Sequence, residues 1–259
     1  MKHRPRKRFG QNFLTDSLVV QQIIAAIDPE PGQLILEIGP GRAALSQPLA
    51  ESGAELHLLE IDRDLAASLR SFFAGREHIT VHQGDALEMD YASMTGGRPF
   101  RLAGNLPYNI STPLLFHVLR WHDLIIDMHF MLQQEVVQRM AAQPGGKTWG
   151  RLSVMCPYRC AVIPLFRVPP ASFTPAPRVE STVVRLLPHA KPPVHIDDKK
   201  AFERLVSQAF SLRRKKLRNS LRGLLDEKQI SALGIDPGAR PETLGLEEFA
   251  ALANHCSHG

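Results

Sequence analysis

The residues best suited to chemistry stand together at Asn105-Leu106-Pro107-Tyr108, directly after the apolar, strand-like residues 100–103. They suit an exocyclic amine on a flat heterocycle, because the Asn105 side-chain oxygen and the Leu106 main-chain carbonyl can each accept one amine hydrogen. The Tyr108 ring can stack on such a base, and Pro107 restricts the backbone so that both acceptors keep their direction. The same four residues also fit an ordinary turn after a strand, so the motif needs support from the rest of the chain.

A glycine-rich loop, Glu37-Ile38-Gly39-Pro40-Gly41, ends one predicted strand and opens a helix. Loops in this position border the ligand crevice of a doubly wound α/β fold, and Gly39 and Gly41 let the backbone approach a ligand closely. The spacing fits a dinucleotide site as well as another nucleoside, so the loop alone does not choose the cofactor.

Acidic residues follow the next two predicted strands. Glu60 ends the second strand, where a carboxylate suits a ribose diol. Asp85 follows the third strand and can accept the amine of an adenine that lies across three strand ends, although it also fits a helix cap. Asp62 and Asp64 are interpreted as caps of the second helix. The joint placement of Glu60 and Asp85 favours S-adenosylmethionine as the cofactor.

Periodicity in the sequence predicts the elements that hold these residues. The predicted strands are 34–38, 55–61, 79–83, 101–103, 125–132, 153–162 and 181–187, the last two as a hairpin across a Pro-rich loop. The predicted helices are 17–27, 43–52, 63–73, 112–121 and 135–142, followed after a linker by 199–210, 215–225, 227–233 and 246–254. Alternating strands and helices imply a parallel sheet. We therefore predict an α/β cofactor-binding catalytic domain at 1–187 and a small all-helical domain at 188–259.

Positive charge gathers in two places, although Lys and Arg exceed Asp and Glu only by 31 to 26. The N-terminal cluster contains Lys2, Arg4, Arg6, Lys7 and Arg8, and the C-terminal cluster contains Arg213, Arg214, Lys215, Lys216 and Arg218. Basic runs bind polyanions through phosphate contacts, but they also occur as solvated faces. Beside a motif that binds a base, they favour RNA, with Arg8 and the C-terminal cluster as its contacts.

Composition excludes several classes of protein. With 259 residues and 44% apolar content, the chain can form one large core or one large and one small domain. Its three cysteines do not form a disulfide framework, and we assign no residue to a metal. No apolar run approaches the roughly 20 residues of a membrane span, and Gly-Gln-Asn follows the basic start instead of a signal-peptide core. The expected location is the cytoplasm.

Further motifs extend this pattern over almost the whole chain. They are Arg8 through Leu14, the loop at 37–41, Glu60, Gly84-Asp85-Ala86, residues 105–108, Gly150 through Val154, Phe173 through Val179, and Phe210 through Leu221. With these motifs the sequence resembles the ribosomal RNA small-subunit adenine dimethyltransferases. The resemblance implies a Rossmann-like class I methyltransferase fold with a mostly parallel seven-stranded sheet.

The resemblance also implies a reaction and its site. The implied reaction is dimethylation of two adjacent adenosines near the 3′ end of 16S rRNA in the small ribosomal subunit, by a monomer. Cofactor contacts are implied at Asn12, Leu14, Gly39, Glu60, Asp85 and Asn105, and Gly41 belongs to the same loop. Phe173 is interpreted as a second face that holds the flipped base against Tyr108, although it also fits plain loop packing. Arg42 and Gln134 depart from the family pattern, without touching the expected chemistry.

Three alternatives stay open. A large-subunit rRNA adenine methyltransferase of the macrolide-resistance type shares the Asn-x-Pro-aromatic motif and the segment Gln11-Asn12-Phe13. A non-catalytic factor for small-subunit assembly can use the same fold. A nicotinamide oxidoreductase fits least, because residues 105–108 would have no task in it.

Overall fold

The computed structural model describes residues 11–212 and 214–257 of the chain. It divides into two compact units, one formed by Met1–Val137 with Ile163–Pro188 and the other by Gln138–Val162 with His189–Gly259. Within the described part of the chain, no helix has both the length and the apolar character needed to cross a membrane.

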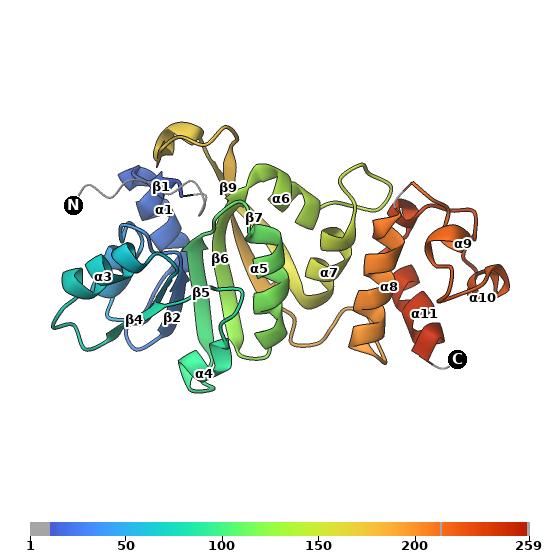
Figure 1. The fold of residues 1–259 in the computed structure, drawn as a ribbon, viewed down its shortest axis with the longest axis horizontal. Coiled ribbons are helices and arrows are strands. Elements are labelled where there is room, and N and C mark those ends of the chain that lie inside the picture. Colours follow the sequence, from blue (N-terminus) through green and yellow to red (C-terminus); the bar gives the residue numbers. More distant parts are fainter. Residues whose placement is uncertain (1–10, 213, 258–259) are drawn as a thin grey trace. The chain divides into compact units, whose positions relative to one another are not determined.

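A seven-stranded sheet has the order β4-β3-β2-β5-β6-β9-β7 (Figure 1), and all of its strands except the first residues of β7 belong to the first unit. Its strands are β2 (Leu34–Ile38), β3 (Glu55–Glu60), β4 (Ile79–Gln83), β5 (Phe100–Asn105), β6 (Ile125–Gln133), β7 (Cys160–Val168) and β9 (Ser181–Pro188). β2 through β6 pair in parallel, and β9 runs antiparallel to β6. The predicted mostly parallel seven-stranded α/β sheet is confirmed.

Helices occupy the connections between strands and most of the C-terminal region. The α-helices are α1 (Ser17–Ile27), α2 (Ser46–Glu51), α3 (Arg63–Phe72), α4 (Tyr91–Thr95), α5 (Ser111–Val118), α6 (Gln134–Met140), α7 (Arg151–Arg159), α8 (Lys199–Ser211), α9 (Leu217–Ser220), α10 (Glu227–Ala232) and α11 (Leu246–Ser257). Short 3-10 turns lie at Leu119–Trp121, Pro170–Ser172 and Pro241–Thr243.

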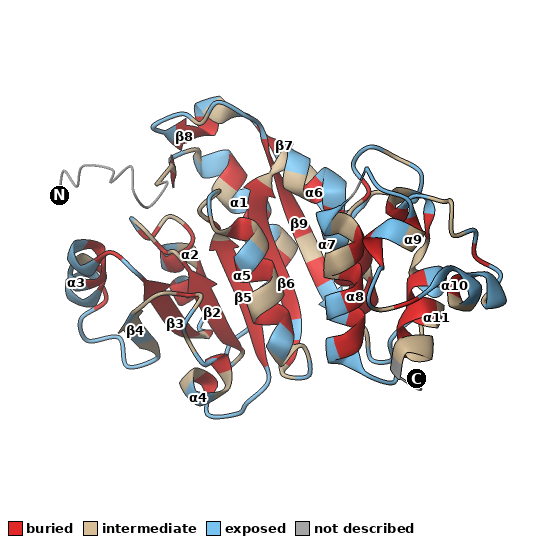
Figure 2. Ribbon diagram, turned by 45° about the vertical axis from the view of Figure 1, so that its right-hand side comes forward, coloured by how far each residue is buried: buried red, intermediate tan, exposed pale blue. Residues whose placement is uncertain are grey.

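The core lies on both faces of the sheet, as expected for parallel strands covered by helices. β2 is buried at every position, and it is drawn as a buried strand in Figure 2. On one face, Ile23 and Ile27 of α1 belong to the same cluster as Ile35 of β2 and Met131 of β6. Leu114, Leu115 and Val118 of α5, which is drawn beside β6 in Figure 1, are buried as well. This packing fixes the carboxyl ends of the central strands.

α1 begins and ends where the sequence predicts. The Asp16 side chain accepts hydrogen bonds from the main-chain N–H groups of Leu18 and Val19, which satisfies donors at the start of the helix. Asp28 takes a left-handed conformation and donates its N–H to the Ile24 carbonyl, and Pro29 follows. Local chemistry alone therefore determines both ends of this helix.

The second unit contains α7 through α11. α8 is its central helix and contacts α7, α9 and α11. Aromatic pairs hold these contacts: the rings of Tyr158 and Phe202 lie 5.0 Å apart, and those of Phe210 and Phe249 lie 5.5 Å apart. The unit also takes in residues 138–162, which the predicted boundary at 187/188 places in the first domain. The functional assignment of the two predicted domains stays a prediction.

The prediction of one strand over 153–162 is wrong in its first part. α7 covers Arg151–Arg159, and the strand β7 begins only at Cys160. The helix begins because the Ser153 side chain accepts the Gly150 N–H at 3.0 Å, while Leu152 and Met155 are buried at helical spacing. A short apolar run fits the periodicity of a strand as well as that of a buried helix, so the sequence alone does not show where the helix ends and the strand begins.

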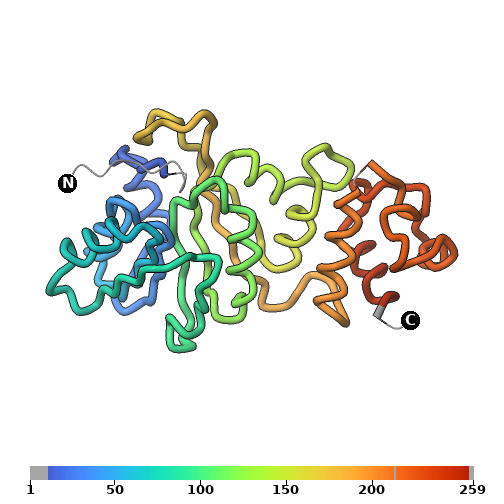
Figure 3. The backbone as a smooth tube through the Cα atoms, viewed as in Figure 1, coloured from blue at the N-terminus to red at the C-terminus, as the bar shows by residue number. Residues whose placement is uncertain are grey.

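Other elements differ from prediction at their ends or were not predicted. α2 begins only at Ser46, after a turn in which Ala43 has a positive φ of 66°. The helix predicted at 215–225 shortens to α9. The small antiparallel pair of β1 (Phe13–Leu14) with β8 (Phe173–Thr174) was not predicted, because it joins segments far apart in the chain. Figure 3 shows the blue N-terminal segment beside the gold loop that carries β8.

Candidate active site

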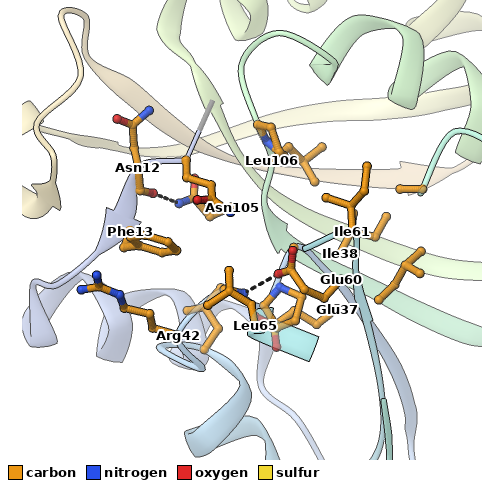
Figure 4. Close-up of a pocket in the computed structure, with 18 of the residues that line it drawn as sticks. Asn12, Phe13, Glu37, Ile38, Arg42, Glu60, Ile61, Leu65, Asn105 and Leu106 are labelled. Carbon is orange, nitrogen blue, oxygen red and sulfur yellow. Dashed lines mark hydrogen bonds between the residues drawn. The ribbon is translucent and has the colours of Figure 1, made fainter. Parts of the chain in front are cut away.

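A cavity opens at the carboxyl ends of the parallel strands, where ligands bind in open α/β sheets. The space within it, including the part open to solvent, is about 940 Å³. Figure 4 shows Asn12 with Asn105 on one side and Glu37 with Glu60 on another. The predicted site residues that line it are Asn12, Leu14, Gly39, Gly41, Glu60, Asp85, Asn105, Leu106, Pro107 and Tyr108. The fold thus gathers residues from β1, β3, β5 and the loops after the strands, while the role of each stays a prediction.

The loop after β2 needs its glycines. Gly39 and Gly41 have φ values of 70° and 55°, a region that side chains rarely adopt. A Cβ atom on Gly41 would lie only 3.1 Å from the Phe13 ring. The Gly39 N–H donates to the Leu59 carbonyl at 2.9 Å, which ties the loop to β3. This tight cradle lets main-chain atoms form the cavity wall.

Glu60 holds that loop from the end of β3. Its Oε2 accepts the Gly41 N–H at 3.0 Å, and its Oε1 accepts the Asp62 N–H at 2.9 Å. The side chain is 4% exposed, and burial raises its pKa. Each carboxylate oxygen keeps a further lone pair for a ligand hydroxyl. The arrangement fits the predicted ribose diol.

Asp85 follows β4 on the cavity wall. Its Oδ1 accepts the Leu87 N–H at 2.9 Å, so one oxygen takes part in a local turn, where the sequence also allowed a helix cap. Asp62 is confirmed as the N-cap of α3, where it accepts the Asp64 N–H at 3.0 Å. Asp85 therefore combines a turn contact with a position on the cavity, and Asp62 does not line it.

Asn105 ends β5 with its amide fixed in one orientation. Its Nδ2 donates to the main-chain carbonyl of Asn12 at 2.9 Å (Figure 4). Because a carbonyl accepts and never donates, the amide nitrogen belongs on this side, and Oδ1 stays available as an acceptor. The main chain just before β1 thus orients the side chain that the sequence predicts to receive an amine hydrogen.

The next residues form a turn that is tied to its surroundings. Leu106 is 1% exposed, and its N–H donates to the Met131 carbonyl at 3.2 Å. The Pro107 carbonyl accepts the Ser111 hydroxyl at 2.9 Å. Tyr108 is half-buried on the cavity wall, and burial raises the pKa of its phenol, so the group stays neutral near pH 7.

Phe173 is not among the residues that line the cavity. It lies in β8, is 3% exposed and packs in the core cluster, with its Cα paired to Leu14 of β1. A stacking role for Phe173 requires β8 to move. Its place as the second face of a base clamp stays a prediction that this arrangement does not support.

The C-terminal basic cluster is exposed over most of its described length. Arg214, Lys215 and Lys216 are exposed, while Arg218 is half-buried and lies 3.5 Å from Glu227. Arg8 and Arg213 lie outside the described residues. Exposed side chains of this kind are available to phosphates. Their role as RNA contacts stays a prediction.

Two further charged residues, Arg42 and Glu37, line the cavity. Arg42, which departs from the family pattern, places its guanidinium over the Phe13 ring at 4.4 Å from the centroid, and both residues line the cavity. Glu37, the penultimate residue of β2, is only 2% exposed, and burial raises its pKa to about 8. The sequence indicates Glu37 only as part of the glycine loop. A buried, perturbed carboxyl could have been predicted there, because Glu37 is an acid within an otherwise apolar strand.

We expect Glu37 to make stability fall with pH. A carboxyl whose pKa is higher in the folded than in the unfolded chain stabilises the fold fully only below its unfolded pKa, and that contribution is lost as pH rises through about 8. Glu37→Gln stays neutral at every pH. Thermal unfolding is measured without ligand at pH 6 and pH 9. Between these pH values the free energy of unfolding of Glu37→Gln should rise relative to that of the original chain by on the order of 2 kcal/mol.

A matched variant separates this effect from general charge. Glu88→Gln changes an exposed glutamate outside the cavity and should show no such gain. If the free energies of unfolding of Glu37→Gln and the original chain differed by the same amount at both pH values, the raised pKa of Glu37 would be contradicted.

The mostly parallel sheet, the glycine loop and the acids at successive strand ends define a class I methyltransferase that uses S-adenosylmethionine. The model of the family described as Ribosomal RNA adenine dimethylase matches residues 2–257. The chain belongs to this family. It is an enzyme that dimethylates adenine in ribosomal RNA and takes its methyl groups from S-adenosylmethionine.

Relatives of high identity share one name. A Ribosomal RNA small subunit methyltransferase A from Laribacter hongkongensis (strain HLHK9) is 53% identical over 258 residues, which cover 100% of this chain and 97% of the relative. The protein of the same name from Chromohalobacter salexigens is 51% identical, over 98% of this chain and 92% of its own.

Solved structures show the same fold. The 23S rRNA methyltransferase ErmE is similar with a TM-score of 0.72 and 26% identity, over 95% of this chain and 100% of its own. A dimethyladenosine transferase from Plasmodium falciparum is similar with a TM-score of 0.75 and 24% identity, over 93% of this chain and 95% of its own.

Proposed function

We propose that this enzyme dimethylates two adjacent adenosines near the 3′ end of 16S rRNA in the small ribosomal subunit. The observation that carries the proposal is the identity of about one half, over nearly the whole chain, to proteins named for the small subunit. The 23S enzyme is only 26% identical. The large-subunit alternative is therefore not favoured, although it shares the fold and the motif.

The residues of the cavity fit the cofactor. Gly39 and Gly41 have positive φ values, and a Cβ atom on Gly41 would crowd the Phe13 ring. Glu60 presents carboxylate oxygens, and Asp85 lies at the next strand end. Asn12 and Leu14 also line the cavity. S-adenosylmethionine, when bound, supplies an activated methyl group. Residues of the chain must then place the adenine amine against it.

The Asn-Leu-Pro-Tyr turn performs that placement in our proposal. The adenine amine is a weak nucleophile because its lone pair is delocalised into the ring. Asn105 Oδ1 and the Leu106 carbonyl each accept one amine hydrogen, which directs the lone pair toward the cavity and stabilises the positive charge that develops on nitrogen. The amine becomes acidic as it is methylated, so its proton leaves to solvent without a strong base.

The base must leave its stack to reach the cavity. The Tyr108 ring then offers an apolar face on the cavity wall. After one transfer the amine keeps one hydrogen, so the methylated base must turn within the same space. An assembly role without catalysis would not need this constellation, although the enzyme can still contribute to ribosome biogenesis. We propose that it acts as a monomer in the cytoplasm.

Parallel reactions with the two ribosomal subunits test the substrate. Small and large subunits that lack the modification are incubated with the enzyme and labelled S-adenosylmethionine, and the label in each rRNA is counted. We expect label in 16S rRNA alone. Label in 23S rRNA would support the large-subunit alternative, and tight binding to small subunits without label would support an assembly factor.

The C-terminal basic cluster should set the salt dependence of RNA binding. Replacing Arg214, Lys215 and Lys216 together with Gln removes three exposed charges and should lower the slope of log affinity against log salt by roughly 2 to 3. Cofactor affinity should not change. Binding to small subunits is measured over a series of salt concentrations.

The control for this variant replaces exposed lysines elsewhere in the same compact unit, Lys191→Gln with Lys228→Gln. The control should keep most of the original slope. An unchanged slope in the triple variant would place the cluster away from the RNA.

A further inference from the structure

The hydroxyl of Tyr108 meets a second hydroxyl that the catalytic motif does not contain. Its Oη lies 2.6 Å from Oγ of Ser181, and either atom can be the donor. Ser181 is fully buried, whereas Tyr108 is half-buried and lines the cavity. A buried hydroxyl pair at this distance is a short hydrogen bond that water does not replace.

The main chain of Tyr108 is already fixed. On one side the Leu106 N–H donates to Met131 of β6 at 3.2 Å. On the other side the Pro107 carbonyl accepts the Ile110 N–H at 3.2 Å and the Ser111 hydroxyl at 2.9 Å. The bond to Ser181 adds a restraint at the far end of the ring.

Ser181 is itself held by the sheet. It begins β9, and its Cα pairs with Gln133 at the end of β6. The preceding residue, Glu180, accepts the Gln134 N–H at 3.0 Å. The Tyr108 side chain therefore spans from the end of β5 to the start of β9, with β6 between them in the sheet. The turn that carries Tyr108 is bound to Met131 of β6, and the hydroxyl of Tyr108 is bound to Ser181 of β9.

We infer that Ser181 is a positioning residue that fixes the plane of the Tyr108 ring for the target adenine. The inference rests on the proposed function, in which Tyr108 offers a stacking face. A ring held at both ends is already ordered before the base arrives, so binding the flipped base does not have to restrict it. The hydroxyl is directed at Ser181, which leaves the ring face, and not the phenol oxygen, as the part offered to the base.

Single and double variants test this assignment. Ser181→Ala and Tyr108→Phe each remove the same hydrogen bond, from opposite ends. Each should raise the KM for small subunits by roughly 5- to 30-fold with a smaller change in kcat. The affinity for S-adenosylmethionine, measured by calorimetry, should stay within about twofold of the original. The KM of the double variant should not exceed the higher KM of the two single variants, because all three variants lose the same hydrogen bond.

The matched control is Thr182→Val, which removes the hydroxyl of the next residue in β9, on the other face of the sheet. It is 6% exposed, so its burial resembles that of Ser181. Its KM for small subunits should match that of the original enzyme. Thermal unfolding of each variant separates loss of folded protein from loss of positioning.

The outcomes distinguish this inference from the function on which it rests. No methylation of small subunits by the original enzyme would defeat the proposed function itself. If the original enzyme is active, an unchanged KM in Ser181→Ala, or losses that add in the double variant, would overturn the role of Ser181. Should Ser181→Ala not fold, Tyr108→Phe carries the test, and its unchanged KM would overturn the inference in the same way.

Discussion

Asn105→Ala should lose methyl transfer by about 100- to 1000-fold while it still binds small ribosomal subunits. Alanine removes the amide oxygen that accepts an amine hydrogen in the proposed mechanism. It also removes the Nδ2 donor that binds the Asn12 carbonyl, so the segment before β1 loses one contact with the end of β5. The measurement is the single-turnover rate of labelled methyl transfer at saturating cofactor, with subunit binding measured alongside.

Asn109→Ala is the matched control for this prediction. Asn109 lies in the same turn, is exposed and does not line the cavity. Its single-turnover rate should match that of the original enzyme. If Asn105→Ala turned over as fast as the control, the proposed amine contact would be wrong.

Glu60→Gln should weaken the binding of S-adenosylmethionine by about 10- to 100-fold, because hydrogen bonds to a charged group contribute about 1.5–3 kcal/mol. The carboxylate accepts main-chain N–H groups of Gly41 and Asp62 at the same time. A glutamine presents one NH₂ group in place of an oxygen, so one of these donors meets another donor. The glycine loop and the expected ribose contact are disturbed together.

Calorimetry with S-adenosylmethionine and with its demethylated product measures this loss. Both ligands carry the same ribose, so both should weaken by a similar factor. Asp64→Asn, at an exposed acid in the first turn of α3, is the control and should bind both ligands normally. A normal affinity in Glu60→Gln would remove Glu60 from the cofactor site.

The sequence predicts the parallel half of the fold well because local signals are strong there. β2 and β4 have the predicted bounds, and α1 has its cap at Asp16 and its stop before Pro29. Carboxyl ends of parallel strands meet at one edge, so Gly39, Glu60 and Asn105 are brought together by the topology alone. This is why motifs far apart in the chain indicated one cavity.

Features that depend on packing were not predicted from the sequence. β1 and β8 are two residues each and pair across more than half of the chain, a contact that no periodicity signals. The apolar run at 153–162 is helical up to Arg159 and becomes a strand at Cys160. This change depends on tertiary packing and not on local periodicity. Phe173 was placed against the base from its aromatic type, but in the structure its ring completes the core. Ser181 contributes through a single hydroxyl contact, which no sequence motif specifies.

The central claim is that this cavity adds two methyl groups to the amine of each of two adenosines. Its most direct test is to let the enzyme act on unmodified small subunits, digest the rRNA and identify the nucleosides by mass spectrometry. We expect N6,N6-dimethyladenosine, at about two per subunit, and we expect Asn105→Ala to form it about 100- to 1000-fold more slowly. A methyl group on another atom, or the same product formed by Asn105→Ala at the rate of the original enzyme, would contradict this claim.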